Sequence, residues 1–329
     1  MWTSRAGLNP CTVHASARRL TPMTHPLNLQ LNGFKGIDFN ADDLGLDAMR
    51  RACEAVRLDG AGRMLATIIT DRLDRMTARI DRLATLHAED ELVREVMAGI
   101  HIEGPFISPL PGFVGAHPHE HVLSASVDMA KRLVDASRGL VRLVTLAPEH
   151  DASHATTRWL AGQGILVSAG HCDPSLAMLN DAIDAGLSCF THLGNGCPLM
   201  LHRHDNIIQR VLAADRLRWV MVIADGVHLP PMLLRTIIRQ IGIDRTIAVT
   251  DATAAAGMGP GRYVLAGQEV VVGEEGAAWA PDRSHLVGST ATMDDIRGFL
   301  GCAVGLSDAD VDRLTVDNPL RALDGERDK

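Results

Sequence analysis

Residues that bind metals or carry protons recur at the ends of short apolar runs along this chain of 329 residues. Glu103 ends one such run, and His171 and His192 follow two others. One carboxylate and two imidazoles are a common ligand set for a catalytic divalent metal, because three protein ligands leave a further position for water or substrate. Asp251 follows a fourth run and is a candidate proton carrier. These residue types predict metal-assisted hydrolysis.

The apolar runs themselves predict the fold. Eight of them alternate with longer segments whose apolar residues lie three or four positions apart, and this alternation is typical of βα units around a parallel sheet. Eight such units predict an α/β protein with a (β/α)8 TIM barrel, whose strands converge with their C-terminal ends on one mouth. A doubly wound open sheet is the main alternative, but the chain has no GxGxxG motif after the first run. The expected strands are 27–32, 64–70, 98–103, 141–147, 165–169, 189–192, 220–224 and 247–250.

The rest of the chain gives the expected domain organisation. Residues 1–22 contain no acidic residue and no regular apolar spacing, so we expect a disordered leader or a stretch that precedes the true start. Residues 23–329 are expected to form one barrel domain, with a β-hairpin insertion around 261–287. The expected helices include 46–58, 73–86, 126–137, 153–161, 175–185 and 231–241.

Composition excludes several classes of function. The net charge is −8 and the basic residues are scattered, which argues against nucleic acid or an anionic membrane as a partner. Only three lysines occur, so a Schiff-base lysine has few candidate positions. No apolar run approaches the roughly 20 residues that span a bilayer. Six cysteines without a CxxC pair indicate a reducing compartment, and we expect the cytoplasm.

Each candidate residue also has a purely structural interpretation. A single histidine or aspartate at a strand end is more often a hydrogen-bonded structural residue than a ligand. Five strand ends carry metal-binding or proton-carrying residues, at Glu103, His171, His192, Asp225 with His228, and Asp251. This number favours function, because the strand ends of a barrel meet. Cys172 and Cys197 lie next to the expected site, but small packed thiols are the simpler interpretation of both.

Six ordered motifs carry a resemblance to a known family. They are HIEGPFIS (101–108), GAHP (115–118), SAGH (168–171), THLGN (191–195), DGVH (225–228) and TDA (250–252). Together they resemble the N-acetylglucosamine-6-phosphate deacetylases of the amidohydrolase superfamily, and residues 318–323 are similar to the closing barrel helix of that family. The resemblance implies a hydrolase of linear amides that deacetylates N-acetylglucosamine 6-phosphate in amino sugar metabolism.

The resemblance also implies roles for single residues. Glu103, His171 and His192 match the metal ligands, and Asp251 matches the catalytic base and acid. One divalent ion per subunit is expected, with Zn²⁺ first and Fe²⁺, Mn²⁺ or Co²⁺ compatible with the same ligands.

Further residues match contacts to the substrate. His228 matches a histidine that holds the substrate carbonyl, which gives it a catalytic role as well. Arg203 matches an arginine that reaches the phosphate in a neighbouring subunit, so a homodimer is expected. The full set of expected substrate contacts is His117, Asn195, Gly196, Arg203 and His228.

The chain departs from the family pattern at three places. Two-metal amidohydrolases carry His-x-His at the end of the first strand, whereas this chain has Gln30, Leu31 and Asn32, which predicts a single metal. Gly194 and the loop 200–206 differ from the common family sequence, so phosphate recognition is less firmly predicted than amide hydrolysis. We also expect the small β-sandwich domain of the family to be missing.

Two other functions are compatible with the sequence. The first is hydrolysis of a different N-acyl amino sugar or of a small amide without phosphate. The second is a sugar-phosphate-binding barrel without catalysis, which failure to bind any divalent metal would favour.

Overall fold

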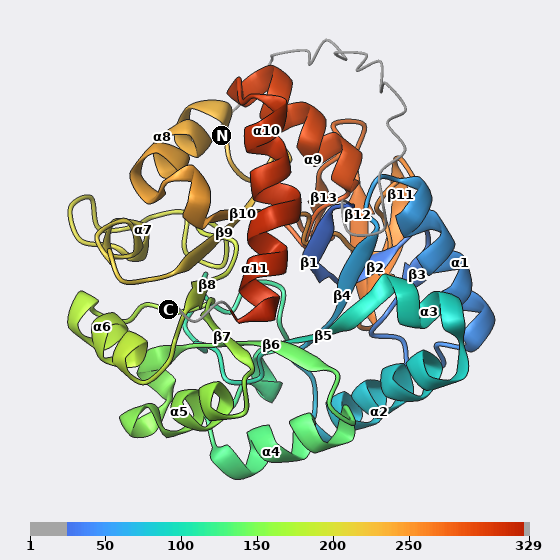
Figure 1. Ribbon diagram of the computed structural model, residues 1–329, viewed down its shortest axis with the longest axis horizontal. Coiled ribbons are helices and arrows are strands. Elements are labelled where there is room, and N and C mark those ends of the chain that lie inside the picture. The colour runs from blue at the N-terminus through green and yellow to red at the C-terminus, as the bar shows by residue number, and fades with distance from the viewer. Residues whose placement is uncertain (1–24, 326–329) are drawn as a thin grey trace.

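A nearly closed parallel barrel forms the centre of the molecule. The computed structural model describes residues 25–325, so the expected leader, 1–22, lies outside the described residues. Eight parallel strands pair with their neighbours in chain order (Figure 1). This confirms the predicted (β/α)8 barrel, and each expected strand agrees with an observed one to within two residues. The strands are β1 (Leu27–Leu31), β4 (Arg63–Ile69), β5 (Met97–Glu103), β6 (Val141–Leu146), β7 (Leu166–Ala169), β8 (Cys189–Phe190), β9 (Trp219–Ile223) and β10 (Thr246–Val249).

The first and last strands meet at a short seam near the mouth. Leu31 and Ala252 form an isolated parallel bridge there. Two backbone hydrogen bonds close the same seam, from Asp251 N to Gln30 O (3.0 Å) and from Asn32 N to Ala252 O (2.8 Å). Asp251 is therefore fixed by the contact that completes the barrel.

Helices cover the outside of the strands, as Figure 1 shows. The helix α8 illustrates why they form: Pro231 stands in its first turn, its buried side chains lie three or four positions apart, and Gly242, with φ of 92°, ends it. The described helices are α1 (Leu46–Leu58), α2 (Leu73–Glu89), α3 (Glu91–Val96), α4 (Val127–Ala136), α5 (Ala155–Gly162), α6 (Leu176–Asp184), α7 (Ile207–Leu212), α8 (Pro231–Ile241), α9 (Met293–Phe299), α10 (Asp308–Asp312) and α11 (Asn318–Asp324). None of them is long and apolar enough to cross a membrane.

The helix α11 closes the end of the barrel opposite the mouth. Its Leu320 and Leu323 pack against an apolar cluster that includes Leu27 and Trp219 from the strands. The buried Asn318 side chain donates hydrogen bonds to the carbonyl oxygens of Ile243 (2.8 Å) and Thr246 (2.7 Å). Apolar packing thus fills this end, and the polar side chains gather at the other.

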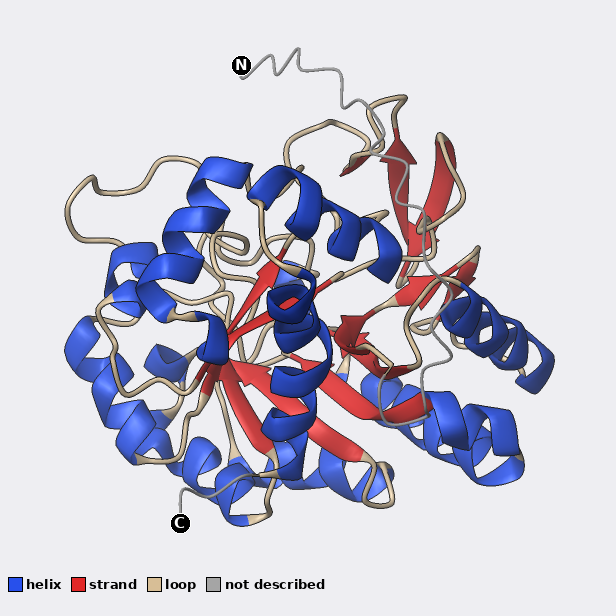
Figure 2. Cartoon of the chain, turned by 45° about the horizontal axis from the view of Figure 1, so that its top comes forward, coloured by secondary structure: helices blue, strands red, loops and turns tan. Residues whose placement is uncertain are grey.

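A small antiparallel sheet lies beside the mouth (Figure 2). The expected hairpin consists of β11 (Gly261–Leu265) and β12 (Gln268–Val272), and the structure adds a third strand, β13 (Ala278–Trp279). Gln268 Nε2 donates to Ala116 O (2.9 Å). The backbone amide of Ala266 donates to Asp38 Oδ2 (2.7 Å), next to the short pair β2 (Gly33–Phe34) and β3 (Ile37–Asp38). These contacts fasten the small sheet to the loops at the mouth.

Candidate metal and active site

Four strands place charged or ionisable side chains at the mouth of the barrel. Glu103 is the last residue of β5, whereas His171, His192 and Asp251 each stand two residues beyond β7, β8 and β10. Those three residues have φ values of 51°, 35° and 49°, in the left-handed region that residues other than glycine rarely adopt. Strained backbone of this kind clusters at functional sites, where the surrounding structure holds it in place.

Glu103, His171 and His192 form a buried group with the geometry of a metal site. Glu103 Oε1 lies 2.8 Å from His192 Nε2 and 3.4 Å from His171 Nε2. One ligand atom of each residue lies within 4.8 Å of the others. A carboxylate and two imidazoles with converging lone pairs suit a divalent ion with an open coordination position. The residues present therefore fit a catalytic metal.

The surroundings of His171 fix the direction of its ring. His171 Nδ1 lies 2.7 Å from the carbonyl oxygen of Phe113, so Nδ1 carries a proton and the ring is held with Nε2 toward Glu103. Gly115 and Gly196 stand against the same ring, and a Cβ on Gly196 would lie 2.9 Å from His171 Nδ1. Both glycines have positive φ, so any larger residue there would be strained and would crowd the ligand.

Glu103 is held as a carboxylate. Burial alone would raise the pKa of its carboxyl group, but the hydrogen bonds and charges of His171 and His192 outweigh burial and hold the pKa well below its ordinary value. An anionic Glu103 is the form that binds a cation.

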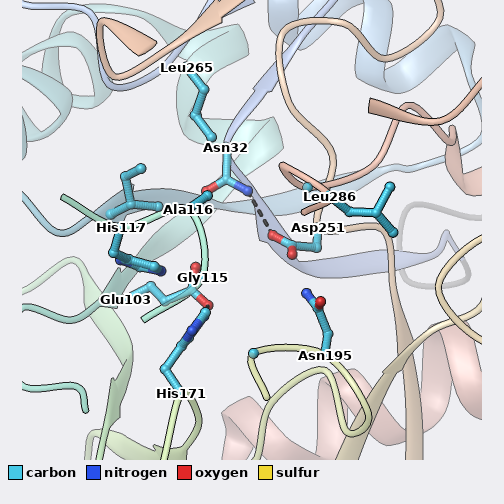
Figure 3. Close-up of a pocket in the computed structure, with 13 residues that line it drawn as sticks. Asn32, Glu103, Gly115, Ala116, His117, His171, Asn195, Asp251, Leu265 and Leu286 are labelled. Atoms are coloured by element: carbon cyan, nitrogen blue, oxygen red, sulfur yellow. Dashed lines mark hydrogen bonds and ion pairs between the residues drawn. The ribbon is translucent and has the colours of Figure 1, made fainter. Parts of the chain in front are cut away.

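Asp251 lies beside this group, and the pKa of its carboxyl group is shifted in the opposite direction to that of Glu103. Burial, followed by the negative charge of Glu103, raises the pKa of Asp251 to about 6. Its Oδ1 accepts hydrogen bonds from Asn32 Nδ2 (2.8 Å) and Gln30 Nε2 (3.0 Å). Figure 3 shows the Asn32 side chain pointing at Asp251. A carboxylate with a pKa near neutrality is suited to take up and return a proton.

His117 borders the opposite side of the group. Its Nδ1 accepts a hydrogen bond from the backbone amide of Thr70 (3.3 Å) and lies 2.7 Å from Thr70 Oγ1. Burial, then the charge of His171, lowers the pKa of His117 to about 3, so the ring is neutral. With Nδ1 used as an acceptor, the proton resides on Nε2, and His117 can donate a hydrogen bond to a ligand.

His228 is oriented by a neighbour in the DGVH motif. Its Nδ1 lies 2.7 Å from Asp225 Oδ2, while Asp225 Oδ1 accepts from the backbone amides of Val227 and His228. The buried Nε2 of His228 has no hydrogen-bond partner among residues 25–325. That nitrogen is therefore available to a ligand.

Glu103, His117, His171 and Asp251 line one pocket at the mouth of the barrel. Asn195 and Gly196 line it beside Asp251, and Leu265 and Leu286, from the region of the small sheet, add an apolar wall (Figure 3). The structure therefore brings most of the expected site residues together.

Three expected residues, His192, Arg203 and His228, are not among the described residues that line the pocket. His192 still belongs to the metal group, because its Nε2 lies 2.8 Å from Glu103 Oε1. His228 follows β9 at the mouth, and a positive charge on its ring lowers the pKa of Asp251. Arg203 is exposed on the loop between β8 and α7. The structure of one chain therefore does not bring Arg203 to the site.

Sequence reasoning missed the contribution of several residues. From the sequence alone, Gln30 and Asn32 are recognised only as replacements for the two histidines of a His-x-His motif. In the structure both side chains donate hydrogen bonds to Asp251. Their alternation at the end of a strand is the signal that could have placed both side chains at the mouth. Thr70 also ends a predicted strand, whereas nothing in the local sequence marks Leu265 and Leu286 as pocket residues.

The chain is similar to several characterised deacetylases. It is 32% identical over 271 residues to N-acetylglucosamine-6-phosphate deacetylase of Bacillus subtilis (strain 168), covering 80% of this chain and 66% of that protein. It is 34% identical over 291 residues to the Bos taurus protein of the same name, covering 84% and 69%. N-acetylgalactosamine-6-phosphate deacetylase of Escherichia coli O157:H7 is 28% identical over 297 residues, with 90% and 76% covered. The chain thus spans about two thirds of the length of the first two relatives.

A solved structure agrees with these relatives. The crystal structure of N-acetyl-D-glucosamine-6-phosphate deacetylase from Mycobacterium smegmatis superposes with a TM-score of 0.83 at 30% identity, covering 92% of this chain and 78% of that chain. No family model matches the chain.

The parallel barrel, with a carboxylate and two imidazoles converging at its mouth, defines the class of metal-dependent amidohydrolases. Within that class, the chain belongs to the N-acetylglucosamine-6-phosphate deacetylase family.

Proposed function

We propose that this protein hydrolyses the acetamide group of N-acetylglucosamine 6-phosphate to glucosamine 6-phosphate and acetate, in amino sugar metabolism. The observation that carries the proposal is that Asp251 lies beside the buried group of Glu103, His171 and His192 in a chain that belongs to this deacetylase family.

We propose that Glu103, His171 and His192 hold one divalent ion per subunit. Zinc is the first candidate, and Fe²⁺, Mn²⁺ and Co²⁺ accept the same nitrogen and oxygen ligands. When bound, such an ion polarises a carbonyl oxygen and lowers the pKa of water toward about 7.

Asp251 then carries the proton through the reaction. The carboxylate takes a proton from water as the water oxygen bonds to the acyl carbon, and it delivers that proton to the amide nitrogen as the carbon–nitrogen bond breaks. Acetate and the amine leave, and Asp251 returns to its starting form. Burial and the charge of Glu103 raise the pKa of Asp251, which makes its carboxylate a better proton acceptor than an exposed aspartate.

The surrounding residues hold the substrate in this proposal. His228, whose Nδ1 is paired with the Asp225 carboxylate, donates from Nε2 to the acyl oxygen when its ring carries both protons, and His117 donates from Nε2 to a sugar hydroxyl. Asn195 and Gly196 contact the phosphosugar from the loop after β8. The apolar side chains of Leu265 and Leu286 cover one side of the pocket and limit the entry of water.

A comparison of three substrates tests the proposed activity. Acetate release is measured with N-acetylglucosamine 6-phosphate, N-acetylgalactosamine 6-phosphate and N-acetylglucosamine without phosphate. We expect the first to have the highest kcat/KM. The second is a specific alternative because the Escherichia coli O157:H7 relative is named for it. Preference for the unphosphorylated sugar would instead favour a deacylase of another N-acyl amino sugar.

We also propose that the protein is a homodimer in which Arg203 reaches the phosphate bound by the partner subunit. The exposed position of Arg203 on a long loop, outside the pocket of its own chain, supports this arrangement. A reducing cytoplasm is the proposed location, in keeping with the free, buried thiols of Cys53, Cys172 and Cys189.

The Arg203→Ala variant checks phosphate recognition. We expect KM for the phosphorylated sugar to rise about 10- to 100-fold, because a charge-assisted hydrogen bond is lost, with little change in kcat. The matched control is Arg239→Ala, which removes an exposed arginine from α8. An equal KM in the Arg203 variant and the control would show that this arginine does not bind phosphate.

A further inference from the structure

Two amide side chains at the end of β1 point into the mouth of the barrel beside the metal site. Gln30 and Asn32 occupy alternate positions, so they share one face of the strand. Both are buried, with 0% and 2% of their surface exposed. A buried amide needs hydrogen-bond partners to offset its loss of water, and these two find theirs on catalytic carboxylates.

The two amides converge on a single oxygen of Asp251. Asn32 Nδ2 donates to Oδ1 at 2.8 Å, and Gln30 Nε2 donates to the same Oδ1 at 3.0 Å. Asn32 Oδ1 has no hydrogen-bond partner among residues 25–325, so the contacts described for the Asn32 amide pass through its nitrogen to Asp251. The lone pairs of Oδ1 are thereby occupied, while Oδ2 is left without these donors.

Gln30 also joins Asp251 to the metal site. Its Nε2 donates to Glu103 Oε1 at 2.9 Å as well as to Asp251. Its Oε1 lies 2.5 Å from the hydroxyl of Thr191, which donates to it. The contact with Thr191 determines which end of the Gln30 amide faces the carboxylates. In the reverse orientation Gln30 Oε1 would face Glu103 Oε1, and both oxygens are hydrogen-bond acceptors.

From this geometry we infer that Gln30 and Asn32 are positioning residues for Asp251: they hold Oδ1 so that Oδ2 is the oxygen that exchanges the proton with water and with the leaving nitrogen. The inference rests on the proposed function. Two neutral donors orient the carboxylate without adding charge to a site that already contains Glu103 and Asp251. Without them the carboxylate can rotate about its Cβ–Cγ bond, and the proton-accepting oxygen loses its fixed place.

A purely structural role for the amides predicts a different outcome. The seam between β1 and the segment after β10 is closed by backbone hydrogen bonds, which side-chain truncation leaves in place. Asn28 offers a matched comparison on the same strand. Its buried side chain donates to Thr250 Oγ1 (2.7 Å) and accepts from Thr250 N (3.2 Å), but it makes no described hydrogen bond to Asp251.

The test compares Asn32→Ala and Asn32→Leu with Asn28→Ala in the metal-loaded protein. We expect both Asn32 variants to lower kcat roughly 10- to 100-fold with KM changed less than about threefold and metal content unchanged. Asn28→Ala is expected to lower the Tm and to keep the kcat of the wild type. Wild-type kcat in both Asn32 variants, or an equal loss of kcat in Asn28→Ala, would overturn the inference.

Metal affinity separates the two amides and does not depend on turnover. Because Gln30 contacts Glu103 and Asn32 does not, Gln30→Ala should weaken Zn²⁺ binding roughly 10-fold in a direct titration, and Asn32→Ala should leave it unchanged. Equal Zn²⁺ affinity in all three proteins would contradict the bridging role of Gln30. If wild-type protein releases no acetate from any of the three sugars, the proposed function is wrong, and this titration still decides the role of Gln30.

Discussion

Replacement of Asp251 by asparagine is expected to lower kcat about 10²- to 10⁴-fold while the protein keeps its metal. The amide has almost the size of the carboxylate, but it cannot take a proton from water or return one to the leaving nitrogen. The loss corresponds to about 3 to 5 kcal/mol of transition-state stabilisation. Glu103, His171 and His192 are untouched, so metal analysis should give the wild-type stoichiometry.

Asp38→Asn is the matched control for this variant. Asp38 is a half-buried carboxylate, and burial also raises its pKa to about 6. It lies in β3 beside the small sheet and is not among the described pocket residues. We expect it to change stability and to leave kcat close to that of the wild type. Near-normal turnover of Asp251→Asn in a pre-steady-state or steady-state assay would contradict the assignment of Asp251 as the proton carrier.

The second large effect is expected from Glu103→Gln. A neutral amide in place of the carboxylate removes the negative charge that attracts the cation, while His171 and His192 remain. Metal content should fall from about one ion per chain toward zero, and acetate release should fall to the background rate. Inductively coupled plasma analysis after gel filtration, together with the acetate assay, measures both quantities.

Glu149→Gln tests whether the loss is specific to the metal site. Glu149 is a partly buried carboxylate that follows β6, and its pKa is raised by burial, but it is not one of the described metal-site residues. We expect this variant to retain both metal and activity. Two results would contradict the single-metal site. The first is one metal ion per chain in Glu103→Gln, and the second is two metal ions per chain, reproducibly, in Glu103→Gln or Glu149→Gln.

Much of the fold could be predicted from the sequence because apolar residues are spaced differently in buried parallel strands and in helices. The alternation of apolar runs and amphipathic segments was sufficient to predict the eight barrel strands, and the residues just after them were sufficient to predict the mouth. Glu103 and His171 could be assigned to one site from the sequence because the strand ends of a barrel converge. The short helices α3 and α7 were not predicted, since six residues give too few turns for a clear apolar stripe.

The contacts that organise the site could not be read from the sequence. Gln30 and Asn32 contact Asp251 across more than 200 positions of chain, and only closure of the barrel brings them together. The left-handed backbone of His192 is likewise imposed by its surroundings and has no local signal, because the residue is not glycine. The third strand of the small sheet, β13, has only two residues and depends on pairing with β12.

The proposed role of Arg203 depends on a second chain. The resemblance places it at the phosphate of a neighbouring subunit, and a single chain shows it exposed on its loop. A contact that forms only between two chains is recorded neither by the periodicity of the sequence nor by the packing within one chain.

Release of acetate from N-acetylglucosamine 6-phosphate, before and after removal of metal with a chelator, is the decisive measurement for metal-dependent deacetylation. We predict that the wild-type protein releases acetate, that chelation abolishes the release, and that added Zn²⁺ or another divalent ion restores it. The reason is that Glu103, His171 and His192 form a group that fits such an ion. Acetate release that continues unchanged in metal-free protein, or the absence of any release from metal-loaded protein, would contradict the proposed chemistry.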